Sequence, residues 1–141
     1  MNATRLVVIP CAARKLSQPA PAGELYVGSY HRACRAAADR LTADGGTLLI
    51  LSDLYGFVRT TQVLQPYDMR VGDPRSVTVD KLREQARELD VDQIEEVIVL
   101  AGRAYAEHCL AIWPHAQAPL VGMGIGRQLQ RLANIRNSGR L

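Results

Sequence analysis

The sequence predicts an α/β fold in three layers, α/β/α, with a mainly parallel four-stranded sheet covered by helices on both faces. Two observations lead to this class. Four short apolar runs alternate with segments whose apolar residues recur every three or four positions. The runs are continuous in Val, Ile and Leu, as is typical of parallel strands buried on both sides. We expect residues 1–141 to form a single α/β domain whose last few residues fray.

Each element has its own signal. The predicted strands are the apolar runs at residues 5–10 (RLVVIP), 47–52 (TLLILS), 96–102 (EVIVLAG) and 118–124 (APLVGMG). The first helix is expected over about residues 27–43, where apolar residues at spacings of 3, 4, 3 and 4 form one face, before the sequence DGG stops it. Ser76 and Thr78 are N-cap candidates for a second helix. A third helix is expected after Gly102, and a last one from Ile125.

Composition narrows the class of protein. Hydrophobic residues make up 48% of the chain, but no apolar run approaches the ~20 residues that a membrane helix needs. The N-terminus lacks the apolar segment of an export signal, so we expect a cytoplasmic protein with no membrane partner. Three cysteines without a C-x-x-C pair indicate reduced thiols. We expect neither a metal, since His108 and His115 lack metal-pair spacing, nor a cofactor.

Charge is unevenly distributed, although the net charge is only +3. Residues 80–96 hold seven acids against three cations, whereas residues 120–141 hold four arginines and no acid. One pole of the molecule should therefore be acidic and another basic. The basic end favours a non-catalytic nucleic-acid- or nucleotide-binding module as one hypothesis for the function.

Chemically rich segments follow all four predicted strands. They are residues 10–23 (PCAARKLSQPAPAG), 52–76 (SDLYGFVRTTQVLQPYDMRVGDPRS), 101–105 (AGRAY) and 122–128 (GMGIGRQ). Ligands of parallel α/β sheets bind outside the carboxyl ends of the strands, so we expect the site to lie where these segments meet. The second segment is a connection of about 24 residues, and an ordered loop of that length is usually functional.

The first segment and the helix after it offer anion-binding and reactive groups. Arg14 and Lys15 suit a phosphate or another anion, or form a solvated loop pair. Cys11 is a nucleophile if its thiolate is favoured, or otherwise a small buried hydrophobe. Tyr26 offers a face for stacking a base, and Ser29 can cap the helix. His31 serves as acid, base or structural residue.

The second segment supplies carboxylates, Asp53 and Asp68. A carboxylate can stabilise the oxocarbenium-like state through which glycosidic bonds break and can activate water. Either aspartate can instead cap a turn of its own loop. Around them, substrate contacts are expected from Ser52, Tyr55, Gly56 and Tyr67, with the tyrosines flanking a base and Gly56 making a tight turn.

The last segment resembles a phosphate-cradling loop, with Gly124 and Gly126 before a helix. Close packing of that helix on a strand explains the same glycines. Arg103 can reach the same anion, or can pair with Glu107 on the next turn.

Two patterns resemble known families. The pattern PC-x3-K at residues 10–15, followed by Tyr26-x2-Ser29-x-His31, resembles the archaeosine synthase core motif, PC-x3-KPY-x2-S-x2-H. About ten additional residues follow the Lys here, and the Ser–His spacing is one residue shorter. The patterns LSDLYGFV, VLQPYD and LAGRAY, over roughly residues 6–130, are similar to an uncharacterised bacterial family of small domains related to YaaA-type peroxide-stress proteins.

The archaeosine synthase domain is similar in fold to uracil-DNA glycosylases. The resemblance therefore implies a three-layer α/β/α domain that handles a nucleobase, nucleoside or nucleic acid, and it marks Cys11, Lys15, Tyr26, Ser29 and His31. Uracil-DNA glycosylases generally carry an acid in the loop after the first strand, but residues 10–23 contain none. A catalytic carboxylate would therefore have to come from the second segment.

These patterns together predict an enzyme that acts on a nucleobase or on the N-glycosidic bond of a nucleoside, nucleotide or nucleic acid, by glycosylase-like or base-modifying chemistry. A homo-oligomer or a larger assembly stays open, because a domain of 141 residues with a long loop can need a partner to close its site.

Overall fold

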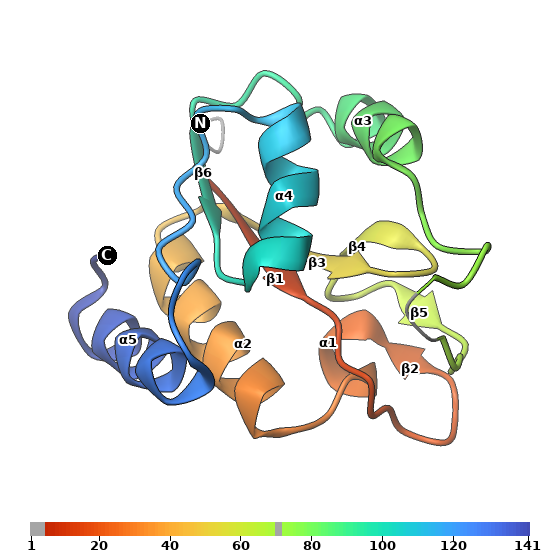
Figure 1. The fold of residues 1–141 in the computed structure, drawn as a ribbon, viewed down its shortest axis with the longest axis horizontal. Coiled ribbons are helices and arrows are strands. Elements are labelled where there is room, and N and C mark those ends of the chain that lie inside the picture. The colour runs from red at the N-terminus through yellow and green to blue at the C-terminus, as the bar shows by residue number, and fades with distance from the viewer. Residues whose placement is uncertain (1–4, 70–71) are drawn as a thin grey trace.

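The computed structural model describes residues 5–69 and 72–141, and over these residues the chain forms a mixed α/β fold with a four-stranded sheet, a two-stranded sheet and five helices (Figure 1). The strand order in the larger sheet is β4-β3-β1-β6. The central strand β1 (Arg5–Pro10) runs parallel to β3 (Thr47–Ser52) and to β6 (Glu96–Val99). Only β4 (Gly56–Arg59) is antiparallel, so the sheet is mainly parallel, and three of the four predicted strands are confirmed.

The fourth predicted strand is wrong. Residues 118–124 form turns, and the chain touches the sheet there only through a one-residue bridge between Gln117 and Ile98. Pro119 has no N–H to donate, and Gly122 has a φ of 90° that strands do not use. The apolar character of the segment reflects burial of Leu120 in the core. The fourth strand is instead β4, a short hairpin partner of β3 inside the long connection.

Side chains of β1 alternate between two core clusters, as the pleat of a strand requires. Leu6 and Val8 pack in one cluster with residues of α3 (Val79–Glu88) and α4 (Arg103–Ile112). Val7 and Ile9 pack in the other with residues of α2 (Ser29–Thr42) and α5 (Ile125–Ser138). In Figure 1, α2 and α5 lie side by side, well away from α3.

The four predicted helices are confirmed close to their expected bounds. Thr78 caps α3 by accepting a hydrogen bond from the Lys81 backbone N–H at 3.1 Å. The last helix continues through Ser138 and ends at Gly139, whose φ of 72° gives a left-handed cap.

Short elements join the two long connections to each other. The first contains β2 (Ala20–Pro21) and α1 (Ala22–Leu25), and the second contains β5 (Val63–Leu64). Strand β2 pairs with β5 in the antiparallel sense. The backbone N–H of Gly23 also donates to the Thr60 carbonyl at 2.9 Å. The segment after β1 is thus fastened to the segment after β3.

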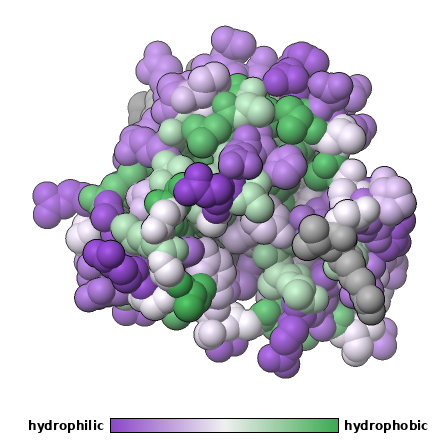
Figure 2. Space-filling view, viewed as in Figure 1, coloured by the Kyte–Doolittle hydropathy of each residue, from purple (hydrophilic) through white to green (hydrophobic). Residues whose placement is uncertain are grey.

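Hydrophobic residues that reach the surface form small separate patches in the view of Figure 2. Within the two described stretches, no helix has both the length and the apolar character that a bilayer crossing requires.

Candidate functional site

The carboxyl ends of β1, β3 and β6 meet at one edge of the sheet. Cys11 follows β1 directly and Asp53 follows β3. Gly102 lies just beyond β6 and caps α4, which places Tyr105 in the first turn of that helix. The order of the parallel strands thus brings together side chains that are 94 residues apart in sequence.

A hydrogen-bonded chain connects the three strand ends. The Tyr105 hydroxyl donates to Asp53 Oδ2 at 3.1 Å and lies 3.4 Å from Cys11 Sγ. A tyrosine hydroxyl carries one proton, and that proton points at the carboxylate. The Cys11 thiol therefore donates to the Tyr105 oxygen. The resulting order is Cys11 S–H, Tyr105 O–H, Asp53 carboxylate.

This arrangement keeps Cys11 protonated at neutral pH. Burial is the main cause that raises the pKa of the Cys11 thiol, and the negative charge of Asp53 raises it further. Hydrogen bonds that the Tyr105 and Tyr67 hydroxyls and the Asp53 backbone N–H can donate to the deprotonated sulfur act in the opposite direction. Burial likewise raises the pKa of Tyr105, so its hydroxyl stays protonated at neutral pH.

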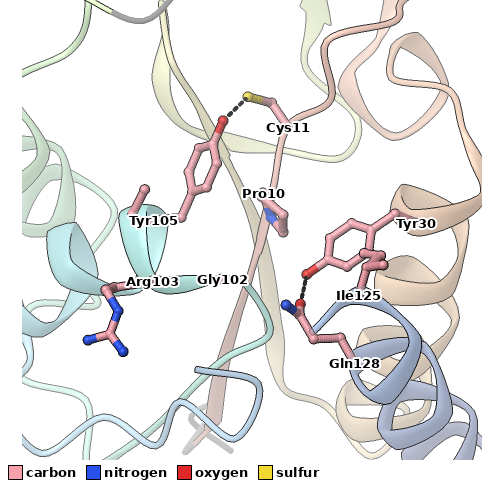
Figure 3. A pocket seen from close by; sticks show the side chains of 9 residues that line it. Pro10, Cys11, Tyr30, Gly102, Arg103, Tyr105, Ile125 and Gln128 are labelled. Carbon is pink, nitrogen blue, oxygen red and sulfur yellow. Dashed lines mark hydrogen bonds between the residues drawn. The ribbon is translucent and has the colours of Figure 1, made fainter. Parts of the chain in front are cut away.

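A pocket of about 390 Å³ opens beside the hydrogen-bonded side chains of Cys11 and Tyr105 (Figure 3). In Figure 3, Pro10 and Cys11 lie along β1 between two walls, Tyr105 on one side and Tyr30 with Ile125 and Gln128 on the other. The Tyr30 hydroxyl donates to Gln128 Oε1 at 2.5 Å, and Gln128 Nε2 donates to the Met123 carbonyl at 2.9 Å. The amide of Gln128 is therefore held in one orientation at the pocket wall.

A second polar cluster, outside the lining of the pocket, joins the two long connections. The hydroxyl of Tyr67 is 2.7 Å from Ser52 Oγ and 2.6 Å from the Tyr26 hydroxyl. Ser52 Oγ also accepts the backbone N–H groups of Leu54 and Tyr55 at 3.2 and 3.0 Å. Burial raises the pKa of Tyr26 to about 12, so these hydroxyls stay neutral.

The two predicted anion-binding residues differ in their surroundings. Lys15 Nζ lies 4.3 Å from the centre of the Tyr67 ring, within cation–π range, and donates to the Ala13 carbonyl at 3.1 Å. Arg14 is exposed, and its carbonyl accepts the Val27 N–H at 3.0 Å. Lys15 therefore sits over the aromatic cluster, while Arg14 points into solvent.

Ser29 and His31, marked by the resemblance, lie outside the Cys11 pocket. Ser29 begins α2 but is exposed, and Gly28 takes the N-cap position with no side-chain hydrogen bond, so the expected capping role is wrong. His31 is buried, and its Nδ1 is 3.1 Å from the Pro10 carbonyl. That carbonyl can only accept, so Nδ1 carries the proton and the unpartnered Nε2 is bare. Burial lowers the pKa of His31 and keeps the ring neutral.

The two candidate carboxylates are also separated. Asp53 is half-buried in the hydrogen-bonded chain, whereas Asp68 is exposed. Only the backbone carbonyl of Asp68 takes part in a hydrogen bond within the described residues, accepting from Arg75 Nη2 at 2.9 Å. The geometry assigns the carboxylate of the site to Asp53.

Gly56 makes the tight turn that its position predicts, with a φ of 78°. The backbone there approaches the Gln85 side chain of α3, which accepts the Phe57 N–H and donates to the Tyr55 carbonyl, both at 2.9 Å. A Cβ on Gly56 would collide with Gln85. Gly56 thus fixes the turn that follows Asp53, and its neighbour is the Gln85 side chain of the protein itself. Tyr55 packs edge-on against Tyr67.

The glycines at the start of α5 do not serve close packing, because a Cβ on Gly124 or Gly126 would meet open space. Both are exposed at the uncapped start of α5, next to the pocket residues Ile125 and Gln128. Arg103 lines the pocket too, and it forms no ion pair with Glu107 in the structure.

Three pocket residues with polar side chains were not among the predicted site residues: Tyr30, Tyr105 and Gln128. The helical spacing made Tyr30 and Tyr105 look like core positions, although Tyr105 lies inside the strand-end segment AGRAY.

Over residues 5–69 and 72–141, no three His, Cys, Asp or Glu side chains come close enough together to hold a metal ion.

Comparison with known proteins identifies relatives without an assigned activity. The chain is 31% identical over 145 residues to the uncharacterized protein YfjM of Bacillus subtilis (strain 168), and the match covers 91% of this chain and 92% of that protein. No solved structure matches the chain. Archaeosine synthase and YaaA-type proteins are not among these findings. Residues 6–134 match the family of unknown function DUF6884, and the chain belongs to that family.

Proposed function

We propose that the protein is an enzyme that acts on a nucleobase or on the N-glycosidic bond of a nucleoside, nucleotide or nucleic acid. One observation carries the proposal: the chain Cys11–Tyr105–Asp53 lies beside a pocket of about 390 Å³ at the carboxyl ends of three strands. Clefts of 300–1,000 Å³ with a few convergent polar groups are typical ligand sites.

The pocket walls suit a flat, polar ring. Tyr30 and Tyr105 stand on opposite sides, and aromatic faces stack any base because every base has a π-face. Because Oε1 accepts from Tyr30 and Nε2 donates to Met123, the fixed Gln128 amide keeps one lone pair and one N–H, which can pair with the edge of a base. These walls favour a base over an aliphatic ligand.

In a hydrolytic reaction, Asp53 is the group that matches the chemistry. The C1′–N bond breaks and its electron pair leaves with the base, while the adjacent carboxylate stabilises the sugar cation. Water then bonds to C1′ and gives its proton to Asp53. Tyr105 holds Asp53 in place through its hydrogen bond at 3.1 Å.

The same geometry permits base modification through Cys11. Transfer of the thiol proton to the Tyr105 oxygen, together with transfer of the Tyr105 proton to Asp53, leaves a thiolate facing the pocket. The thiolate can add to an electrophilic ring carbon; the π bond of that carbon breaks, its electron pair moves to the neighbouring ring atom, and that atom takes the proton now held by Asp53. The two chemistries share Asp53 but differ in their need for sulfur.

Three wider expectations belong to this proposal. The two core clusters on alternate sides of β1 support a three-layer α/β/α arrangement like that of uracil-DNA glycosylases. The motif at Cys11 and Lys15 supports a distant relation to archaeosine synthase, and the patterns LSDLYGFV, VLQPYD and LAGRAY support one to YaaA-type proteins. The three buried cysteines are unpaired, which favours the reducing cytoplasm.

The test is an incubation of the purified protein with nucleosides, nucleotides and mixed-sequence oligonucleotides, with mass spectrometry of released or altered bases. We expect Asp53→Asn to lower turnover by about 100-fold or more, within the usual range for general acid–base groups. Cys11→Ser separates the chemistries, since hydrolysis by Asp53 survives this change and thiolate addition does not.

Two further variants complete the comparison. Asp44→Asn makes the same carboxylate-to-amide change in an exposed loop at the far end of β3 and should keep full turnover. Asp68→Asn should also keep it. Turnover that survives in Asp53→Asn, or the absence of any reaction across all three classes of substrate, contradicts the proposal.

A further inference from the structure

Helices α2 and α5 together carry an unusual concentration of arginine. The chain has no acid from residue 108 to its end, and Asp39 is the single acid of α2. The two helices pack side by side through the second core cluster (Figure 1). Seven guanidinium groups therefore share one region of the molecule: Arg32, Arg35 and Arg40 from α2, and Arg127, Arg131, Arg136 and Arg140 from α5 and its end.

Most of these charges have no acidic partner. Arg35 pairs with Asp39 at 3.0 Å and also donates to the Gly23 carbonyl. The other six arginines form no ion pair with any residue in the described part of the chain. In Figure 2, hydrophilic side chains lie over α5 together with pale and hydrophobic ones. By contrast, the arginine of the acidic helix α3 at position 83 pairs with Asp80.

The unpaired groups form a row along α5. Arg127, Arg131, Asn134 and Ser138 are spaced at i, i+4, i+7 and i+11, so they share one face over about 17 Å of helix. Arg131, Asn134, Ser138 and Arg140 line a surface hollow of about 480 Å³. The row begins beside Gln128, which lines the Cys11 pocket.

We infer that the face of α2 and α5 binds the phosphate backbone of a single-stranded nucleic acid and carries it to the mouth of the Cys11 pocket. Arginine binds phosphate with two parallel hydrogen bonds, and the hollow adds the side-chain amide of Asn134, which can donate to the same oxygens. The uncapped N-terminus of α5, with exposed Gly124 and Gly126, offers further N–H groups at the pocket end of the row.

The choice of a single strand rests on the proposed function. A base inside a duplex is stacked and paired, and it cannot enter a pocket beside β1 without leaving the helix. A single strand presents its bases at no such cost, and a row of cations with aromatic side chains at its end is the usual arrangement for binding one.

The experiment measures binding of a fluorescent 15-nucleotide single strand by anisotropy at several salt concentrations. The double variant Arg127→Gln/Arg131→Gln should weaken binding about tenfold or more at low salt and should flatten the slope of log K against log salt by about 1.4, since each phosphate contact on a single strand contributes about 0.7. The matched control is Arg83→Gln/Arg87→Gln, with the same spacing and charge change on α3. It should change binding less than twofold.

Other outcomes overturn the inference. If Arg83→Gln/Arg87→Gln weakened oligonucleotide binding as much, the binding would depend on the net charge of the protein and not on the α2–α5 face. A duplex of the same length that binds as tightly, through the same two arginines, would remove the single-strand assignment. A polyglutamate peptide or anionic lipid vesicles with that dependence would assign the face to a different partner.

Turnover of a free nucleoside separates this inference from the proposed function. If nucleoside turnover occurs without oligonucleotide binding, the inference fails and the proposed function stands. If the oligonucleotide binds through Arg127 and Arg131 but no base reacts, the inference stands and the proposed function fails.

Discussion

Ser52→Ala is the substitution whose effect follows most directly from the geometry. Ser52 is fully buried at the end of β3, and its hydroxyl makes three hydrogen bonds. Its oxygen accepts the N–H groups of Leu54 and Tyr55, which uses both lone pairs. Its proton must therefore go to the Tyr67 oxygen, and the Tyr67 proton then goes on to Tyr26. Alanine removes all three bonds and leaves two backbone N–H groups without this partner.

Each such bond contributes about 1 kcal/mol to stability, so the free energy of unfolding should fall by about 2–4 kcal/mol. With an m-value near 2 kcal/mol/M, the midpoint of urea unfolding should move down by about 1–2 M. Ser29→Ala makes the same change at an exposed position without a cap bond and should cost under about 0.5 kcal/mol. A loss in Ser52→Ala no larger than in Ser29→Ala would refute the reasoning.

Two other predictions concern pH. The pH at which Cys11 becomes reactive toward iodoacetamide is followed by peptide mass mapping. It should rise in Tyr105→Phe, which removes the hydroxyl that hydrogen-bonds the thiolate and so lowers the Cys11 pKa, and it should fall in Asp53→Asn, which removes a charge that raises this pKa. Shifts in the same direction would contradict these two roles. Burial lowers the pKa of His31 in the folded state below its value in the unfolded chain, which is near 6.5. The stability that depends on the neutral ring is therefore fully present above pH 6.5 and is lost as the pH falls through the pKa of the folded state. His31→Gln should flatten the fall of the unfolding midpoint in that window, and an unchanged pH profile would exclude this role for His31.

Strand prediction succeeded where an apolar run had only one structural explanation. The runs at β1 and β3 lie in the middle of the sheet and the run at β6 lies at its edge, but all three are buried on both faces, so burial and strand pairing coincide. Residues 118–124 have similar composition, but Leu120 reaches the core from a turn. Strand β4 escaped notice because four residues at a sheet edge, beside turn residues, give too little periodicity to detect.

The site was predictable as far as strand order determines it. Cys11 and Asp53 follow strands directly, and neighbouring parallel strands end at the same edge. Tyr105 was not distinguishable from a core residue, since its spacing on α4 is the same in both cases. Which of the two aspartates faces the site depends on the path of the chain after Tyr55, and local sequence does not encode that path.

The pairing of β2 with β5 couples the two long connections, so that neither can open without the other. Each strand has only two residues, yet the Tyr26–Tyr67 hydrogen bond joins the same two segments a second time. Separating the segments requires both links to break, so they open and close as one cooperative unit. Asp53 stands at the start of one segment and Cys11 at the start of the other. Loss of the β2 pairing would therefore also loosen the segment that begins at Asp53, although β2 and Asp53 are far apart in sequence.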